Sequence, residues 1–323
     1  MIRHAPILGT TSFPVRRPRA GVAVAGTGSR YAEAMSDRVL VSLRGEVLDP
    51  DAPLLRADDL GVVRGDGVFE TLLVRGGRPM QTAAHLERMQ QSAAMLDLAV
   101  PSAKDWLAAI DVAATQWGDT AEGAMRLVCT RGPESGGDPT AFVSVSGISD
   151  RVHEARTEGV TAITLTRGFS VDLAAAAPWQ LLGAKTLSYA TNMAALRYAE
   201  ERGAREVVFV SSEGFVLEGP RSTVVVSRDG VLTTPPPAQG ILPGTTQRAL
   251  FALAARRRVR CEYAAMRPAD LITADGVWLV SSVTLAARVH TLDGLVLPEV
   301  ADGAAFSALV DDAIEQGEQL RTS

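Results

Sequence analysis

The chain has 323 residues, 46% of them hydrophobic and 21% charged, with a formal net charge of -5. This length allows two domains or one large one, and the apolar content is enough for a sizeable core. The acidic balance argues against a nucleic-acid-binding protein, which usually has a basic face. No apolar run approaches the roughly 18 residues of a membrane span. The two cysteines are far apart and lack metal-ligand spacing, so we expect a cytoplasmic protein without a disulfide framework.

Residues 1–36 differ in composition from the rest of the chain. They hold five arginines against one acid, Glu33, with scattered Pro and Gly. They contain no continuous apolar core of a signal peptide. We expect a disordered N-terminal extension, with two alternatives: a natural start at Met35, or a transit peptide.

Residues 37–150 are predicted to form a small α/β domain. Their clearest element is an amphipathic helix over 82–98, because Leu86, Met89, Ala93 and Leu96 recur at helical spacing. The other predicted elements are a hairpin over 38–48, a turn, strand and Gly-Gly hairpin over 62–80, a helix over 104–117, and strands over 123–132 and 140–148.

Residues 155–323 are predicted to form a larger, β-rich domain with helices, after a polar connector over 150–159. Ser188 is a plausible N-cap for a helix over 188–202. The other predicted helices cover 245–257, 268–274 and 302–323, with loops over 172–183 and 235–244. The predicted strands cover 160–166, 206–212, 215–219, 222–234 with a turn at 228–230, 261–266 and 276–282.

Lys185 is the first candidate for chemistry. The chain has 32 basic residues but only two lysines, and Lys185 lies in an apolar, neutral run, LLGAKTLSYATNMAAL. Burial of an ammonium is costly and lowers its pKa, which favours an amine nucleophile that forms Schiff bases. The alternative is a lysine whose stem packs while its head reaches water.

The segment LPGTTQ predicts a helix that begins at Thr245 or Thr246, directly after a Pro-Gly turn. Free N–H groups and the positive end of the helix dipole make such a terminus an anion site, although an ordinary helix N-cap is the alternative. Arg88 could contact the same anion, or could be a solvated surface residue. The hydroxyls of SSVT, at 281–284, lie at the end of a predicted strand.

Glu218 lies in VLEGP between two apolar strands. A carboxylate at such a place needs a cationic partner if it is buried; the alternative is an exposed acid at a hairpin turn. A lysine nucleophile, a phosphate-binding helix end and a buried acid together fit pyridoxal 5′-phosphate (PLP). The four histidines show no paired metal spacing, so we predict no catalytic metal.

The order of motifs resembles the class IV (fold type IV) PLP enzymes. The motifs are RGDGVFET, HLERMQQSA, AKTLSYATNMAA, FVLEGPRSTVVV, ILPGTTQ and VSSVTLAA, and they extend over about residues 38–300. The resemblance implies an α+β, two-domain fold like that of the D-amino acid aminotransferases. It also implies PLP in the cleft between the domains, a small-molecule amine substrate and a homodimer.

The resemblance also assigns roles to single residues. It makes Lys185 the Schiff-base lysine and general acid/base, and Thr71 a second catalytic residue. It assigns cofactor binding to Glu218, Arg88, Thr245, Thr246, Tyr189 and Ser282. Tyr189 lies four residues after the lysine, where the branched-chain enzymes have five. The expected substrate-binding residues are Arg126, Arg131 and Phe69.

The activity within the family is predicted from a few positions. Thr71 resembles the 4-amino-4-deoxychorismate lyases, in which a hydroxyl near the substrate can assist proton transfer. Arg126 instead resembles the carboxylate-facing region of branched-chain aminotransferases, and CTRG at 129–132 resembles both lyases and D-amino acid enzymes. We therefore expect a lyase that releases pyruvate and forms 4-aminobenzoate. The alternatives are an aminotransferase for D-amino or branched-chain amino acids, and a non-catalytic protein that has kept the fold.

Overall fold

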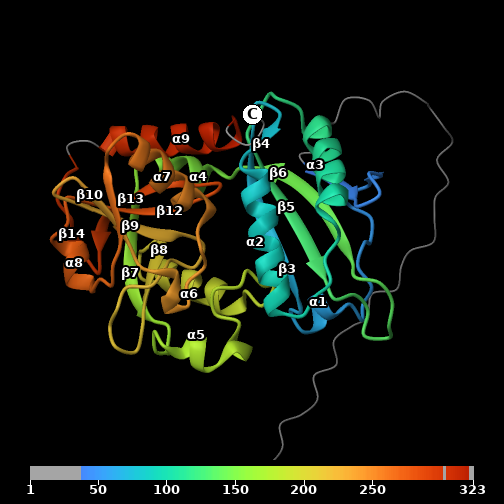
Figure 1. The fold of residues 1–323 in the computed structure, drawn as a ribbon, viewed down its shortest axis with the longest axis horizontal. Helices are drawn as coiled ribbons and strands as arrows, with labels where there is room; N and C mark the ends of the chain where they lie inside the picture. The colour runs from blue at the N-terminus through green and yellow to red at the C-terminus, as the bar shows by residue number, and fades with distance from the viewer. Residues whose placement is uncertain (1–37, 301–302, 320–323) are drawn as a thin grey trace, which may run out of the picture. The chain divides into compact units, whose positions relative to one another are not determined.

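A computed structural model describes residues 38–300 and 303–319 (Figure 1). The extension predicted over 1–36 lies outside the described residues. From Arg38 onward, the described residues belong to one compact unit by their contacts. No helix among them is long and apolar enough to cross a lipid bilayer.

The first half of the chain forms an antiparallel sheet with the strand order β2-β1-β6-β5-β3-β4. Its strands are β1 (Arg38–Ser42), β2 (Val47–Leu48), β3 (Gly67–Arg75), β4 (Arg78–Pro79), β5 (Gly123–Thr130) and β6 (Ala141–Gly147). In β3, the side chains of Val68, Leu72 and Val74 are buried in the core of this sheet. Because side chains alternate along a strand, Phe69 and Thr71 point to the opposite face.

Two helices, α2 (Thr82–Met95) and α3 (Ala103–Trp117), cover the core face of this sheet. Helix α3 begins after Ser102, whose side chain accepts a hydrogen bond from the Asp105 N–H, an ordinary N-cap. The turn predicted before β3 contains the short helix α1 (Leu60–Val63). Figure 1 shows α2 on the side of the first sheet that is nearer to the second half of the chain.

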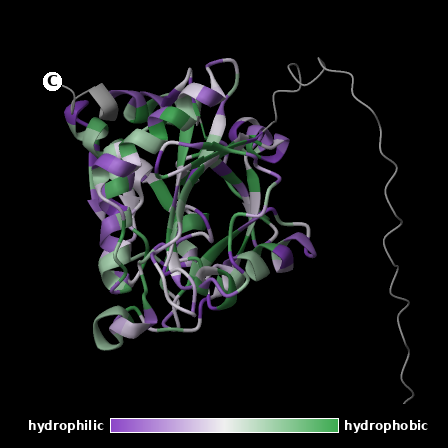
Figure 2. Ribbon diagram, turned by 90° about the vertical axis from the view of Figure 1, so that its right-hand side faces the viewer, coloured by the Kyte–Doolittle hydropathy of each residue, from purple (hydrophilic) through white to green (hydrophobic). Residues whose placement is uncertain are grey.

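The second half forms a mixed sheet with the strand order β11-β10-β9-β12-β13-β7-β8, and β14 pairs with β13. Its strands are β7 (Val160–Thr166), β8 (Glu206–Val210), β9 (Thr223–Arg228), β10 (Val231–Thr234), β11 (Arg260–Tyr263), β12 (Gly276–Ser281), β13 (Leu285–Leu292) and β14 (Leu295–Val296). The pairs β7–β8, β7–β13 and β10–β11 are parallel, and the others are antiparallel. Figure 2 shows hydrophobic residues along the strands and hydrophilic residues on outward-facing helix surfaces.

The helices of this half are α4 (Asp150–Thr157), α5 (Leu173–Ala176), α6 (Ala190–Glu200), α7 (Thr245–Arg256), α8 (Pro268–Ile272) and α9 (Gly303–Gln319). Helices α7 and α9 pack on one face of the sheet, where the rings of Trp278 and Phe306 stack with centroids 3.9 Å apart. Leu271 of α8 and Ala155 of α4 belong to a separate core. Leu73 of β3 and Met80 also belong to the core under α7 and α9, so this core joins the first sheet to the second. The predicted α+β class is confirmed.

The structure corrects several sequence predictions. The polar connector contains helix α4, and the loop over 172–183 contains α5 and the short 3-10 helix at Pro178–Gln180. Ser188 is not an N-cap, because α6 begins at Ala190 and the Ser188 hydroxyl donates to the Gly65 carbonyl. Residues 215–219 form a single β-bridge and no regular strand, while β13 and β14 were not predicted. The domain bounds 37–150 and 155–323 stay a prediction.

The segment around Lys185 belongs to the second half but pairs with the start of β3. The Phe69 N–H donates to the Lys185 carbonyl at 3.2 Å, and the Leu187 N–H donates to the Gly67 carbonyl at 2.8 Å. Gly67 allows this approach, since a Cβ there would lie 2.7 Å from the Leu187 side chain and 2.6 Å from the Cys129 carbonyl oxygen. The candidate lysine is therefore fixed to the first sheet by backbone hydrogen bonds.

Candidate active site

The backbone of Lys185 is also anchored from α2. Its N–H donates to the buried Ser92 hydroxyl at 3.0 Å. Ser92 lies on the same side of α2 as the buried Met89 and Arg88, because residues three and four apart share a helix face. The lysine is thus held by β3 of the first sheet and by α2, which covers that sheet, although it lies about a hundred residues later in the sequence.

The Lys185 amine lies among aromatic rings. Its Nζ is 4.5 Å from the ring centroid of Phe69 and 5.7 Å from that of Tyr189, and the two rings meet edge to face. Burial, together with the nearby Arg88 charge, lowers the pKa of Lys185 to about 8, while Glu70 and Glu218 act in the opposite direction. Roughly a tenth of the amine is therefore unprotonated at pH 7, far more than for an ordinary lysine.

Glu218 is buried and paired, so the alternative of an exposed turn residue is wrong. Arg167 donates to its Oε1 at 2.7 Å, and the Leu242 N–H donates to its Oε2 at 3.0 Å. Burial raises the pKa of Glu218, and the Arg167 charge and the Leu242 hydrogen bond oppose that shift. Arg167 was missed in the sequence, although it directly follows the apolar strand β7. Its guanidinium lies 4.9 Å from the Phe209 ring centroid, a cation–π distance.

The N-terminus of α7 forms the second part of the site. Thr245 and Thr246, its first residues, are buried, and the N-cap Gly244 provides no side-chain cap. The Thr245 Oγ1 lies 3.3 Å from the Ser282 Oγ, and the His85 Nε2 lies 3.3 Å and 3.2 Å from these two oxygens. A buried helix start with uncapped N–H groups and converging hydroxyls is suited to bind an anion.

Arg88 is buried and forms an ion pair, so it is not a solvated surface residue, and it also contacts the loop that leads into α7. Its Nε and Nη2 donate to the two carboxylate oxygens of Glu70 at 2.7 Å each, and its Nη1 donates to the Pro243 carbonyl at 3.0 Å. Glu70 is fully buried and also lies 2.7 Å from the His85 Nδ1. Although burial opposes ionisation, the Arg88 and His85 partners hold the pKa of Glu70 well below its usual range.

Glu70 and His85 were not recognised from the sequence as parts of a site. Alternation along β3 gave a signal for Glu70, because it shares the parity of Val68 and Leu72, which are buried. An acid at a core position requires a buried cation. The partner could not be read from the sequence, since Arg88 lies on a different element.

Of the predicted substrate-binding residues, Phe69 and Arg126 lie on paired strands of the first sheet, while Arg131 lies beyond the end of β5. Phe69 and Thr71 share one face of β3, and Thr71 lies directly opposite Arg126 on β5. Arg126 is exposed, and its Nη1 lies 3.3 Å from the Ser146 hydroxyl. The face that presents Phe69 to the Lys185 amine therefore also presents a hydroxyl and a guanidinium.

Arg131 and Tyr189 already have partners within the chain. Arg131 donates to Asp66 at 2.7 Å and to the carbonyls of Leu96 and Asp97, near the end of α2. The Tyr189 hydroxyl donates to the Pro220 carbonyl. The roles assigned to these two residues stay predictions.

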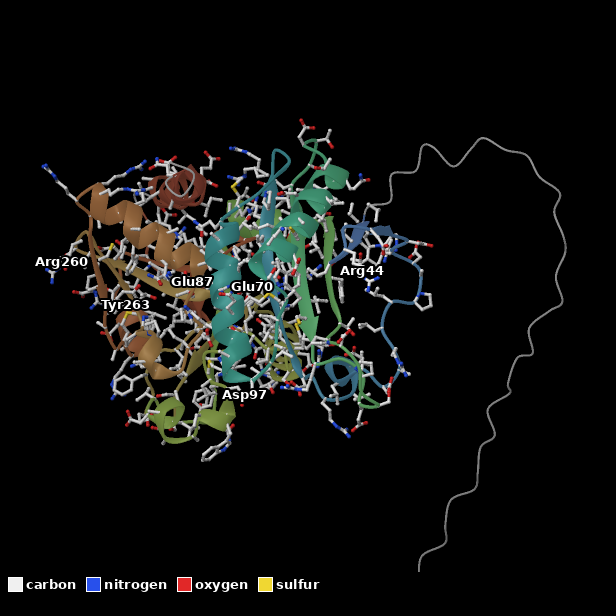
Figure 3. All side chains as sticks on the ribbon, turned by 45° about the vertical axis from the view of Figure 1, so that its right-hand side comes forward. Arg44, Glu70, Glu87, Asp97, Arg260 and Tyr263 are labelled. Carbon is white, nitrogen blue, oxygen red and sulfur yellow. The ribbon has the colours of Figure 1, made fainter. Side chains whose placement is uncertain are left out.

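The Glu70–Arg88 pair leads to a prediction about stability. The Glu70→Gln variant should lower the free energy of unfolding at neutral pH by about 3 kcal/mol, because it leaves the buried Arg88 charge without its counter-ion. Glu87→Gln is the matched control. Glu87 lies on α2, as Glu70's partner Arg88 does (Figure 3), and it pairs with Arg248 at 3.5 Å, with both side chains exposed. This control should cost less than about 1 kcal/mol in urea denaturation.

The same pair gives a pH dependence with a defined sign. The pKa of Glu70 is lower in the folded state than its ordinary value of 4.5. Its stabilisation is therefore complete above that value and is lost as the pH falls toward the folded-state pKa. The stability difference between wild type and Glu70→Gln should shrink on acidification, and a difference that grew instead would contradict this assignment.

The lowered pKa of Lys185 predicts its reactivity. In cofactor-free protein, labelling of Lys185 by an amine-reactive reagent should rise with a midpoint near pH 8, because the free amine is the reacting form. Peptide mass spectrometry measures this rate, with the exposed Lys104 as the internal reference. A Lys185 profile that superimposes on the Lys104 profile would show that the site does not perturb the amine.

Comparison with known proteins places this geometry in a family. Residues 67–292 match the model of the amino-transferase class IV family. The chain is 54% identical over 285 residues to the bifunctional aminodeoxychorismate lyase / D-amino acid transaminase of Mycobacterium tuberculosis, covering 85% of this chain and 99% of that protein. The PLP-bound structure of a hypothetical aminotransferase from M. tuberculosis has a TM-score of 0.85 at 54% identity, covering 86% of this chain and 99% of that one. A fold IV transaminase from Curtobacterium pusillum has a TM-score of 0.82 at 40% identity, covering 88% and 99% of the two chains. The predicted fold type IV architecture is confirmed, and the chain belongs to the class IV aminotransferase family.

Proposed function

We propose that this chain is a 4-amino-4-deoxychorismate lyase, which releases pyruvate from its substrate and leaves 4-aminobenzoate, a precursor of folate. The chain is a PLP-dependent enzyme. The observation that carries the lyase proposal is the position of Thr71. Its side chain lies on the same face of β3 as Phe69, and the Phe69 ring contacts the Lys185 amine. The M. tuberculosis relative, whose name includes this lyase activity, supports the proposal at 54% identity.

Amino-group transfer is the second candidate function for the same site. The name of the M. tuberculosis relative also includes D-amino acid transamination, and D-alanine aminotransferases from Listeria are 26–27% identical to this chain. The 54% identity of the M. tuberculosis relative supports D-amino acids as the substrate class, while a putative branched-chain-amino-acid aminotransferase from Methanocaldococcus jannaschii, at 28% identity, keeps branched-chain amino acids as the alternative. The exposed Arg126 supports this function as well, because every amino acid brings an α-carboxylate to the site.

The described residues fit PLP. Lys185 would bind the aldehyde through its partly deprotonated amine, and Glu218 would face the pyridine nitrogen. The phosphate would lie at the uncapped start of α7, near Thr245 and Thr246, with Arg88 and the Ser282 hydroxyl at its side. Tyr189, whose ring contacts Phe69, would border the cofactor ring.

PLP supplies an electron sink for the substrate carbon when it is bound. The residues of the chain control protons and orientation around it. Glu218, held by Arg167 and the Leu242 N–H, would in its carboxylate form keep a proton on the ring nitrogen. The Lys185 amine would accept a proton from the substrate carbon that bears the amino group, and the Thr71 hydroxyl would assist that transfer.

Arg126 is the better candidate for binding a substrate carboxylate. Among the described residues, its hydrogen-bond partner is a neutral hydroxyl, that of Ser146, so its charge is available to an anion. Arg131 is committed to Asp66 and to two backbone carbonyls. Phe69 would contact the apolar part of the substrate.

We also propose a cytoplasmic homodimer. Large apolar side chains are exposed at Val62 on α1, at Trp179 before Lys185 and at Met193 on α6, and side chains of this kind mark an interaction surface where they form one contiguous patch. The loop that follows α1 contacts the segment before α6, because the Ser188 hydroxyl donates to the Gly65 carbonyl. Light scattering of the purified protein should give twice the chain mass, and a monomer would refute the dimer.

The lyase proposal is tested with the purified enzyme and two assays. Incubation with aminodeoxychorismate should release pyruvate and 4-aminobenzoate, and a panel of D- and L-amino acids should reveal any keto-acid formation. The Thr71→Val variant should reduce lyase turnover by about 10²-fold, the lower end of the usual effect of proton-transfer assistance. Thr71→Ser, which keeps the hydroxyl, should retain most of the activity.

The outcomes of this experiment separate the alternatives. Absence of 4-aminobenzoate would remove the lyase proposal, and keto acids from the panel would then establish the aminotransferase. Borohydride reduction should fix the cofactor on Lys185, as read by mass spectrometry. A protein that had kept only the fold would carry no such adduct.

A further inference from the structure

The turn between β12 and β13 carries Ser282 and has a strained backbone. Leu285, the first residue of β13, has φ +62°, in the left-handed region that side chains with a Cβ rarely adopt, and it is buried. Inside the turn, the Thr284 N–H donates to the Ser281 Oγ at 3.2 Å. A strained turn needs external contacts to keep one conformation, and Ser282 depends on that conformation to meet Thr245 and His85.

Arg156, in the last turn of α4, provides such a contact. Its Nη2 donates to the Val283 carbonyl at 2.5 Å, one residue beyond Ser282. Its Nη1 donates to Glu122 Oε2 at 2.6 Å, and the Arg156 side chain is 17% exposed. Because a guanidinium is planar and rigid, two contacts on different nitrogens fix the position of the carbonyl relative to Glu122.

Glu122 connects this contact to the first sheet and to α9. It directly precedes β5, and its Oε1 accepts a hydrogen bond from Arg75, at the end of β3, at 2.6 Å. Arg75 also donates to Asp311 of α9 at 3.0 Å. The pKa of Glu122 is lowered, because its hydrogen bonds and ion pairs with Arg156 and Arg75 outweigh the effect of burial. The turn is therefore tied to the strand ends of the first sheet through a chain of charged groups.

We propose that Arg156 is a positioning residue for cofactor binding, which holds the Val283 carbonyl and thereby sets the Ser282 hydroxyl at the phosphate side of the site. This role rests on the proposed PLP site. Arg156 contacts none of the proposed cofactor-binding side chains in the described structure, so its effect passes through the turn. The effect is therefore specific for the phosphate group of the cofactor.

The test compares PLP with pyridoxal, which lacks the phosphate. Both are titrated into full-length, cofactor-free protein, and the dissociation constants are measured from the change in absorbance. In Arg156→Met, the dissociation constant for PLP should rise about tenfold, the size of one hydrogen bond to a charged group. The value for pyridoxal should stay within about twofold of wild type.

Arg205→Met is the matched control. Arg205 pairs with Glu154, which lies on α4 as Arg156 does. The side chains of Arg205 and Glu154 are both more exposed than that of Arg156. This control should leave both dissociation constants unchanged. Glu122→Gln is the second test variant if Arg156→Met fails to fold. It should weaken the binding of PLP but not of pyridoxal, by a smaller factor than Arg156→Met.

The ratio of the two dissociation constants decides the matter. An unchanged ratio in both test variants would overturn the positioning role, as would equal weakening of PLP and pyridoxal, which indicates general disruption. Wild-type protein that binds neither compound would overturn the proposed function and this role together.

Discussion

The buried ion pair between Glu70 and Arg88 is the interaction on which the site depends. Two charges inside a core are stable only when they are paired and fully hydrogen-bonded. Here both carboxylate oxygens are used, by Arg88 and His85, and the guanidinium also reaches the Pro243 carbonyl. That last bond connects α2, which covers the first sheet, with the loop that leads into α7. The pair thus sets the first sheet against the helix start at which the phosphate is proposed to bind.

The same pair shapes the electrostatics around Lys185. The Arg88 charge and burial lower the pKa of the lysine, and the carboxylates of Glu70 and Glu218 limit the shift. Each carboxylate has an arginine partner, Arg88 for one and Arg167 for the other. Because the acids are neutralised locally, neither forms an ion pair with the lysine in the described structure, and the amine keeps its neighbours Phe69 and Tyr189. The arginines therefore preserve a reactive amine between two buried acids.

The turn after β12 shows how distant parts of the chain cooperate at one site. Ser282 reaches Thr245 and His85 from a strained turn, and Arg156 holds the next carbonyl from α4. Glu122 and Arg75 link that arginine to the first sheet. Four segments separated in sequence, around Arg75, Glu122, Arg156 and Val283, are thereby joined by charge-assisted hydrogen bonds, which are stronger and more directional than neutral ones. Such a network suits a site built from residues of two sheets.

The sequence alone determined the class of the protein and the members of the site that stand in recognisable local patterns. Lys185 in an apolar run, the Pro-Gly turn before Thr245 and the acid at 218 between apolar segments are local signals, because burial and helix starts follow from neighbouring residues. The tertiary structure decided the partners. Arg167 for Glu218, Glu70 for Arg88 and the contact of Arg156 with Val283 join residues that lie far apart in the chain or on different elements, so no local pattern encodes them. It also decided that Arg131 is committed to Asp66 while Arg126 is exposed, since two arginines on one short stretch look alike until the strand and the loop around them are folded.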